Sequence, residues 1–182
     1  MKGNILNLLL GVIVLSSDTT PLKAQEVEWL LVFSDEFNQP NGSQPDPAKW
    51  NRAMRNPSIW ARWNSNSDKV VFIKNGSLVC RAIPNKSEPS DTAKMLTGGV
   101  NTMNKFEFQY GKVEVRMKTN FTRGNFPAAW MGKTHQHRDD LYGEIDIAEI
   151  FSNQNKVYHT IHSQYTMKNP RHGMKTSFTT NR

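Results

Sequence analysis

Cysteine is almost missing from this sequence, since Cys80 is the only one among 182 residues. A single thiol cannot form a disulfide within the chain, so packing and hydrogen bonds must stabilise the fold. Beyond residue 15 there is also no apolar run long enough for a membrane-spanning helix, which needs about 20 residues. The formal net charge is +7, but no Lys and Arg cluster with interleaved aromatic residues favours a nucleic-acid partner. We expect a monomer.

The one apolar run, Ile5 to Leu15, lies near the N-terminus behind the basic start Met1-Lys2. A short basic segment, an apolar stretch of about a dozen residues and a small residue at the cut are typical of a secretory signal peptide. We expect residues 1–24 to be that signal peptide, with cleavage after Ala24. The mature protein, residues 25–182, would be secreted or periplasmic and no larger than one domain.

No helical periodicity follows the signal peptide, whereas alternation typical of strands is frequent. Residues 110–119 show it most clearly, because Val113, Val115 and Met117 alternate with charged residues, which predicts a half-buried strand. Asn75-Gly76 between two apolar runs predicts a hairpin of residues 70–73 and 77–83. The same reasoning predicts further strands at 28–33, 59–63, 97–102, 128–131, 142–150 and 156–165. Short, regularly spaced strands predict an all-β sandwich.

Three acids stand out on one of these strands: Glu144, Asp146 and Glu149. On a regular strand Glu144 and Asp146 share one face and Glu149 lies on the other. A β-bulge after Asp146 would turn Glu149 onto the face of the first two. Neighbouring carboxylates raise each other's pKa, so one can stay protonated while another is ionised, as a glycosidase requires. The alternative is an ordinary strand with its acids in water.

The segment Glu-Ile-Asp-Ile-Ala-Glu at 144–149 resembles the signature Glu-x-Asp-x-x-Glu of glycoside hydrolase family 16, which includes laminarinases and agarases. Residues 34–38, 108–116 and 126–130 resemble further segments of that family. The resemblance implies a β-sandwich jelly roll of the concanavalin-like type with a concave substrate cleft. Family modules continue for several strands past the acidic strand. Residues 25–182 therefore resemble the N-terminal two-thirds of a catalytic domain, that is, a truncated domain whose C-terminal strands are missing.

The resemblance also implies a mechanism, with Glu144 as nucleophile, Glu149 as general acid/base and Asp146 tuning the nucleophile. We expect a secreted, retaining endo-β-glycanase that hydrolyses β-1,3-glucan or mixed-linkage β-1,3/1,4-glucan. The alternatives are a hydrolase of red-algal galactans such as agarose and porphyran, and a carbohydrate-binding jelly roll without turnover. We expect no cofactor. A structural calcium ion is common in the family, but we do not predict one here.

Candidate substrate contacts come from aromatic residues and one histidine. Trp130 ends a segment that resembles the family's Trp-Pro-Ala-x-Trp, whose second Trp stacks on the sugar. Trp60, Arg62 and Trp63 are further candidates, because flat aromatic rings cover the apolar face of a pyranose; the alternative for each is simple packing. The resemblance places His162 beside the acids, and His159, three residues earlier, points to the other face as a structural residue.

A second motif points to different chemistry. His135, His137, Asp139 and Asp140 nearly match the His-x-His-x-Asp-His of metallo-β-lactamase-like hydrolases, which would hold zinc and an activated water. However, Asp140 stands where the last His is required, and the helices of that α/β fold are missing. We therefore favour the glycosidase interpretation, with no metal in the active site.

Overall fold

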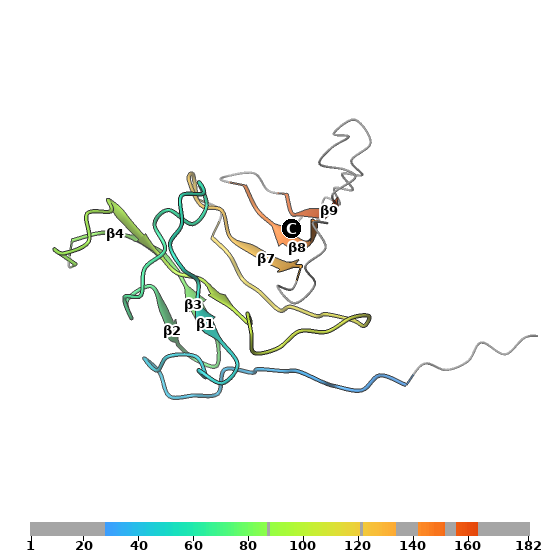
Figure 1. Ribbon diagram of the computed structural model, residues 1–182. Coiled ribbons are helices and arrows are strands. Elements are labelled where there is room, and N and C mark those ends of the chain that lie inside the picture. Colours follow the sequence, from blue (N-terminus) through green and yellow to red (C-terminus); the bar gives the residue numbers. More distant parts are fainter. Residues whose placement is uncertain (1–27, 87, 121, 134–141, 152–155, 164–182) are drawn as a thin grey trace, which may run out of the picture. The chain divides into compact units, whose positions relative to one another are not determined.

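The structure is a computed structural model that describes residues 28–86, 88–120, 122–133, 142–151 and 156–163. The chain divides into two units, Met1–Val32 and Phe33–Arg182. Every strand that the structure describes belongs to the second unit (Figure 1). These described residues contain no helix, and hence none long and apolar enough to cross a membrane.

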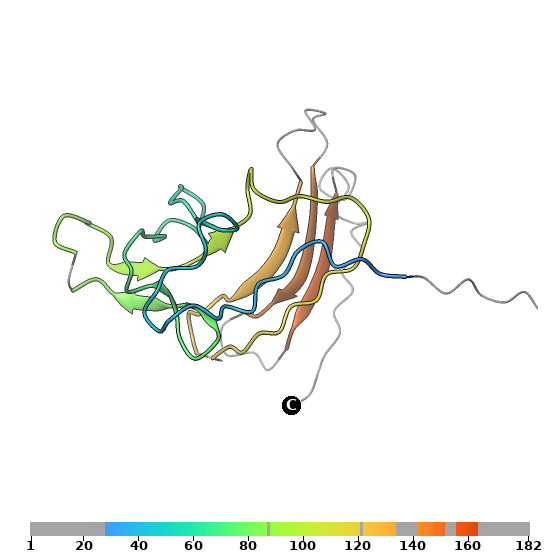
Figure 2. The same cartoon turned by 90° about the horizontal axis from the view of Figure 1, so that it is seen from below.

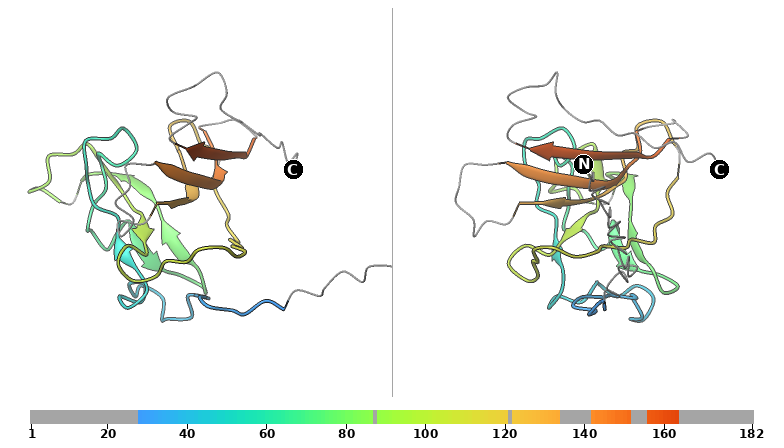
Figure 3. Two further views of the ribbon diagram at one scale, coloured as in Figure 1. Left: turned by 45° about the vertical axis from the view of Figure 1, so that its right-hand side comes forward. Right: turned by 90° about the vertical axis from the view of Figure 1, so that its right-hand side faces the viewer.

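The described strands pair only in the antiparallel sense, apart from one isolated bridge. Two-stranded pairs join β1 to β6, β2 to β3 and β4 to β5, and a three-stranded sheet has the order β7-β8-β9 (Figure 2). Two further views show the three strands of that sheet side by side (Figure 3). In chain order the strands are β1 (Asn51–Arg52), β2 (Val71–Ile73), β3 (Leu78–Cys80), β4 (Ala82–Pro84), β5 (Met95–Thr97), β6 (Val100–Asn101), β7 (Ala128–Gly132), β8 (Gly143–Glu149) and β9 (Tyr158–Ser163).

The hairpin predicted around Asn75-Gly76 is confirmed. Both residues have positive φ, 51° and 64°, as a tight type I′ turn requires, and the Lys74 amide donates to the Ser77 carbonyl over 2.9 Å. The predicted second strand, 77–83, is divided at Arg81, where the ladder changes partner. Up to Cys80 it pairs with β2, and from residue 82 it continues as β4 and pairs with β5.

The interior beneath these pairs is small, and a glycine is packed against it. The Gly98 amide donates to the Arg81 carbonyl over 3.0 Å. A Cβ at Gly98 would lie 2.1 Å from the carbonyl oxygen of Val70, a backbone atom that cannot move independently. Five side chains here are fully buried: Ala61, Val70, Val71, Ile73 and Leu96.

Replacing Gly98 with Ala is therefore expected to destabilise the protein by about 3 kcal/mol, the upper end of typical overpacking costs. Urea unfolding measures the effect. Gly143→Ala is the matched control, because a Cβ at Gly143 meets nothing within 4 Å. Equal stabilities of the two variants would contradict this account of Gly98.

The remaining strand predictions had mixed outcomes. Those at 128–131 and 142–150 are confirmed as β7 and β8, and β9 lies within the predicted 156–165. The strand predicted at 97–102 is interrupted at Gly98-Gly99, so that β5 ends at Thr97 and β6 begins at Val100.

Three other predicted strands are wrong. Residues 59–63 form turns, in which the amide of Arg62 donates to the carbonyl of Ser58 over 3.0 Å. Residues 28–33 and 110–119 lie in no strand, and Val115 is 47% exposed. Alternation of apolar and polar residues indicates which face of a strand would be buried. A strand also needs a neighbouring strand with which its backbone can form hydrogen bonds. Neither segment pairs with a strand that the structure describes.

Candidate active site

The central strand of the three-stranded sheet, β8, contains one residue more than its neighbour β7. Asp146 lies opposite Trp130, and Ala148 lies opposite Ala129. Two steps along β8 therefore correspond to a single step along β7, and Ile147 is the extra residue. This arrangement is a β-bulge, as predicted from the spacing of the acids.

The other neighbour, β9, has the same irregularity. Asp146 pairs with Thr160, and Glu149 pairs with Tyr158, so three steps on β8 correspond to two on β9. Residues directly opposite each other in an antiparallel ladder share a face, and residues 158 and 160 share a face by alternation. Glu149 consequently lies on the face of Asp146, although a regular strand would have placed it on the opposite one.

The bulge has a specific backbone contact. The Nδ1 atom of His159 lies 2.6 Å from the carbonyl oxygen of Ile147. A bulge leaves its extra residue outside the regular ladder, and buried carbonyl groups require a partner. His159, which the sequence predicted to be structural, thus stabilises the turn that re-aims Glu149.

Three cross-strand rows cover one face of this sheet. Each row has one acid of β8 at its centre, one residue of β7 on one side and one residue of β9 on the other. The rows are Gly132–Glu144–His162, Trp130–Asp146–Thr160 and Ala128–Glu149–Tyr158. The face therefore brings together three acids, one tryptophan and one histidine that the sequence singled out.

Asp146 is the most enclosed member of this group. Its side chain is only 4% exposed, and His162 Nε2 lies 3.2 Å from its Oδ2. The same nitrogen lies 3.8 Å from Glu144 Oε1. Oδ2 of Asp146 accepts no aligned hydrogen bond from the described residues, so the contact with His162 is electrostatic and strongest when the imidazole is protonated.

The surroundings of Asp146 and Glu149 raise the pKa of both carboxyls and so favour their neutral, protonated forms. Burial raises the pKa of Asp146, the charge of Glu144 raises it further, and His162 opposes both effects. Burial also raises the pKa of Glu149, together with the charge of Asp146 and a hydrogen bond between these two carboxyls. Thr160 Oγ1 donates to Glu149 Oε2 over 3.4 Å. Glu149 is therefore equipped to carry a proton beside an acid that can ionise.

The stability of the Glu149→Gln variant relative to that of the wild type should increase as the pH rises. Because its folded-state pKa lies above the ordinary 4.5, the folded wild type holds this proton more tightly than the unfolded chain does. The wild type therefore loses stability as the pH rises from the ordinary value through the raised one. Urea unfolding of both proteins between about pH 4 and about pH 8 measures the difference.

The matched control for this experiment is Glu114→Gln, because the side chain of Glu114 is 79% exposed. A stability difference between wild type and Glu149→Gln that stays constant with pH would contradict the raised pKa.

Aromatic side chains adjoin the acids. Trp130 is 47% exposed and Trp60 is 54% exposed, and their rings meet edge to face with centroids 6.1 Å apart. Trp130 leans toward the Glu144 row, because a Cβ on Gly132 would lie 3.1 Å from its ring. The structure thus places Trp60 and Trp130, two of the predicted substrate contacts, against each other.

The other two predicted contacts lie on the same loop as Trp60. The guanidinium of Arg62 stacks over the ring of Trp63 at 4.5 Å, and Arg62 itself is exposed. The ring of Trp63 is thus covered on one side by a neighbour rather than open for stacking. No described contact links this Arg62–Trp63 pair to the acids.

Two residues of the site were missed from the sequence. Tyr142 donates its hydroxyl to Glu144 Oε2 over 2.5 Å, and burial and this carboxylate raise the pKa of the phenol. Thr160 contacts Glu149. Both could have been found by alternation, because Tyr142 precedes Glu144 by two positions and Thr160 precedes His162 by two.

Glu144, Asp146 and His162 also offer three ligand atoms within 4.8 Å of one another, which could hold a divalent cation. The alternative zinc motif, His135 to Asp140, lies outside the described residues. A separate surface hollow of about 450 Å³ is lined by Ser34, Asp35, Glu36, Asn38, Gln39 and Lys49. None of Glu144, Asp146 and Glu149 lines this hollow, so the candidate site is the face of β7–β9 that carries them.

Comparisons with known proteins identify the family. Residues 60–182 match the model of the glycosyl hydrolases family 16. The chain is 36% identical over 139 residues to a keratan-sulfate endo-1,4-β-galactosidase of Sphingobacterium multivorum, covering 75% of this chain and 32% of that protein. It is 32% identical over 140 residues to glucan endo-1,3-β-glucosidase A1 of Niallia circulans, covering 65% of this chain and 20% of that protein. It thus spans a third or less of either relative.

Among solved structures, a pseudo β-1,3-glucanase and immunostimulatory antigen of Mycobacterium tuberculosis is similar, with a TM-score of 0.56 and 27% identity. The match covers 84% of this chain and 62% of that one. Together with the antiparallel strands, this likeness shows the all-β jelly-roll class expected from the sequence. The match of the family model covers well over half of the chain. This protein belongs to the glycosyl hydrolases family 16.

Proposed function

We propose that this protein is a retaining endo-β-glycanase. The observation that carries the proposal is the bulge at Ile147, which places Glu149 on the face of Glu144 and Asp146. A retaining glycosidase needs a nucleophilic carboxylate and a protonated carboxyl that flank the bond to be cleaved and lie about 5–5.5 Å apart, so both side chains must project from the same face of the protein. The raised pKa of Glu149 suits the second role.

In this proposal Glu144 attacks the anomeric carbon while Glu149 gives its proton to the departing sugar oxygen. The glycosidic C–O bond breaks and an ester between the sugar and Glu144 forms. Water then attacks the same carbon, Glu149 takes its proton, and Glu144 leaves as carboxylate. Asp146 and the Tyr142 hydroxyl orient Glu144 between these steps. Two carboxyl groups suffice for this sequence of proton transfers, so we infer that no cofactor takes part.

The first candidate substrate is β-1,3-glucan or mixed-linkage β-1,3/1,4-glucan. The relative from Niallia circulans, named as a glucan endo-1,3-β-glucosidase, supports this choice. The exposed faces of Trp60 and Trp130 suit the apolar face of a glucose ring. We infer secretion through the signal peptide at residues 1–24, because such polymers are too large to enter a cell.

A second candidate is a galactan, including sulfated forms. The relative from Sphingobacterium multivorum is named as acting on keratan sulfate, and agarose and porphyran are red-algal galactans. Arg62 is exposed on the loop that carries Trp60, and a guanidinium can bind a sulfate group with two parallel hydrogen bonds. The net charge of +7 favours an anionic polymer in the same sense.

A carbohydrate-binding jelly roll without turnover remains the competing class, and the similar mycobacterial structure carries the name pseudo β-1,3-glucanase. The presence of all three acids with a shared face favours turnover. A binding module has no use for a carboxyl pair whose pKa values are raised by enclosure.

One experiment tests both class and substrate. The protein is incubated with laminarin, barley β-glucan, agarose, porphyran and keratan sulfate, products are sized by gel chromatography, and the first-formed anomer is identified by NMR. We expect fragments of intermediate size from one polymer class, with the anomeric configuration retained. Products of inverted configuration would refute the roles of Glu144 and Glu149. If every polymer stays intact, the proposal that the protein is an enzyme is refuted.

A further inference from the structure

The loop that carries Trp60 has its two ends tied together by side chains. Arg55 Nε donates to the carbonyl oxygen of Asn64 over 2.8 Å, and Asn64 Nδ2 donates to the carbonyl oxygen of Met54 over 3.2 Å. Compact loops with closed ends of this kind are frequently functional. We call residues 55–64 the tryptophan loop.

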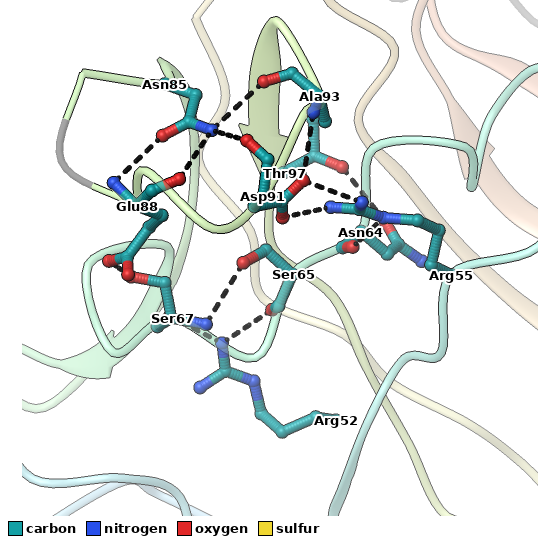
Figure 4. A network of polar contacts seen from close by, with 10 residues as sticks. All are labelled: Arg52, Arg55, Asn64, Ser65, Ser67, Asn85, Glu88, Asp91, Ala93 and Thr97. Atoms are coloured by element: carbon teal, nitrogen blue, oxygen red, sulfur yellow. Dashed lines mark hydrogen bonds and ion pairs between the residues drawn. The ribbon is translucent and has the colours of Figure 1, made fainter.

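The same arginine anchors the tryptophan loop to a second segment. Its Nη1 and Nη2 atoms donate to the two carboxylate oxygens of Asp91 over 2.9 and 2.6 Å (Figure 4). Two parallel charge-assisted bonds fix direction as well as distance. The hydrogen bond from Arg55 is the main reason why the pKa of Asp91 falls to about 2. Asp91 therefore stays ionised and paired throughout the neutral range.

Asp91 is itself held in place. Its Oδ1 accepts the amide of Ala93 over 2.9 Å, and Asn85 Nδ2 donates to the Asp91 carbonyl over 2.6 Å. The other end of the tryptophan loop is fixed to β5, because Thr97 Oγ1 donates to Asn64 Oδ1 over 3.0 Å. Figure 4 shows these contacts meeting at Asp91 and Asn64, the two residues that Arg55 contacts. The anchor is thus a chain of defined bonds rather than an isolated surface ion pair, which would contribute little.

The ring at the tip of the loop needs such an anchor. Trp60 is 54% exposed, and its one described ring contact is the edge contact with Trp130. The neighbouring Ala61 is fully buried, but a methyl group does not orient an indole. We propose that Arg55, with Asp91 as its partner, is a positioning residue for substrate binding that holds Trp60 against Trp130. This rests on the proposed function, because Trp60 and Trp130 are substrate contacts only if the face that carries the acids is where the glycan binds.

Arginine is specifically required for this role. Arg55 uses Nε, Nη1 and Nη2 at once, toward two different segments. A lysine keeps the charge but has a single ammonium group and cannot reproduce the planar fork. Arg55→Lys and Asp91→Asn therefore remove the anchor while changing few atoms.

The experiment compares Arg55→Lys, Asp91→Asn and Trp60→Phe with the wild type. We expect each to raise KM for the cleaved glycan by roughly tenfold, as the loss of one well-placed stacking contact does, with kcat nearly unchanged. The exciton couplet of the Trp60–Trp130 pair in the circular dichroism spectrum should disappear in all three. Glu114→Gln is the matched control, because it removes an exposed ion pair of 3.2 Å with Lys112 outside the network.

The double variant Arg55→Lys/Trp60→Phe separates positioning from general damage. If Arg55 acts through Trp60, the second substitution raises KM no further. Additive effects, a rise in KM with the couplet intact, or a fall in kcat with KM unchanged would each overturn the proposal. A wild type that cleaves no glycan would refute the proposed function instead, and the couplet would still show whether Arg55 fixes Trp60.

Discussion

Replacing Glu144 with Gln is expected to lower kcat on the cleaved polysaccharide by on the order of 10⁴-fold or more, because the attacking oxygen is lost. Glu144 is placed for attack by two neighbours, with the Tyr142 hydroxyl 2.5 Å from its Oε2 and His162 Nε2 3.8 Å from its Oε1. An amide oxygen still accepts the Tyr142 hydrogen bond, so the side chain should keep its position. Binding of the intact polymer, measured by titration calorimetry, should therefore change little.

A second variant checks that the loss comes from the nucleophile. In Glu144→Ala the missing carboxylate leaves space for azide, which should attack from the vacated side and yield a glycosyl azide of inverted configuration. Tyr142→Phe is the control for the hydrogen bond alone, and its fall in kcat should be much smaller than that of Glu144→Gln. If Glu144→Gln keeps most of its turnover, another group is the nucleophile. If the wild type binds sugar without turnover and Glu144→Gln binds equally, the protein is a carbohydrate-binding module.

The sequence predicted the fold class and the shared face of the three acids, but it predicted the individual strands around them less well. The acids were found because their spacing, i, i+2 and i+5, conflicts with strand alternation unless a bulge intervenes. That conflict is a local property of six residues. The hairpin at Asn75-Gly76 was equally local, since turn chemistry alone requires two consecutive residues with positive φ.

Other features depended on distant partners and were missed or wrong. Residues 110–119 have the alternation of a strand, but a ladder depends on an edge elsewhere in the chain. The pairing of Arg55 with Asp91, 36 positions apart, has no sequence signal, because charged residues are common on any surface. Whether Trp60 would meet Trp130 was also unpredictable, since it depends on where the tryptophan loop is anchored.

Replacing Glu149 with Ala is expected to lower kcat by about 10³-fold on a natural polysaccharide, within the usual contribution of a general acid. Activity on an aryl glycoside with a good leaving group should fall much less at the first step, because that leaving group departs without a proton. Deleting Ile147 is the more informative change. It removes the extra residue of the bulge and leaves Glu149 two positions after Asp146, still on the same face by regular alternation.

The deletion also removes the carbonyl that His159 contacts, so the two carboxyls should lose their exact spacing but not their common face. We therefore expect the deletion variant to keep at least about tenfold more activity than Glu149→Ala. Exchanging Ala148 and Glu149 in the full-length strand moves the carboxyl to the other face of the sheet, because position 148 lies opposite Ala129 and is 8% exposed. That variant should be as inactive as Glu149→Ala. A folded deletion variant with no more activity than Glu149→Ala would show that a shared face is not enough, and that the bulge geometry itself sets the reaction.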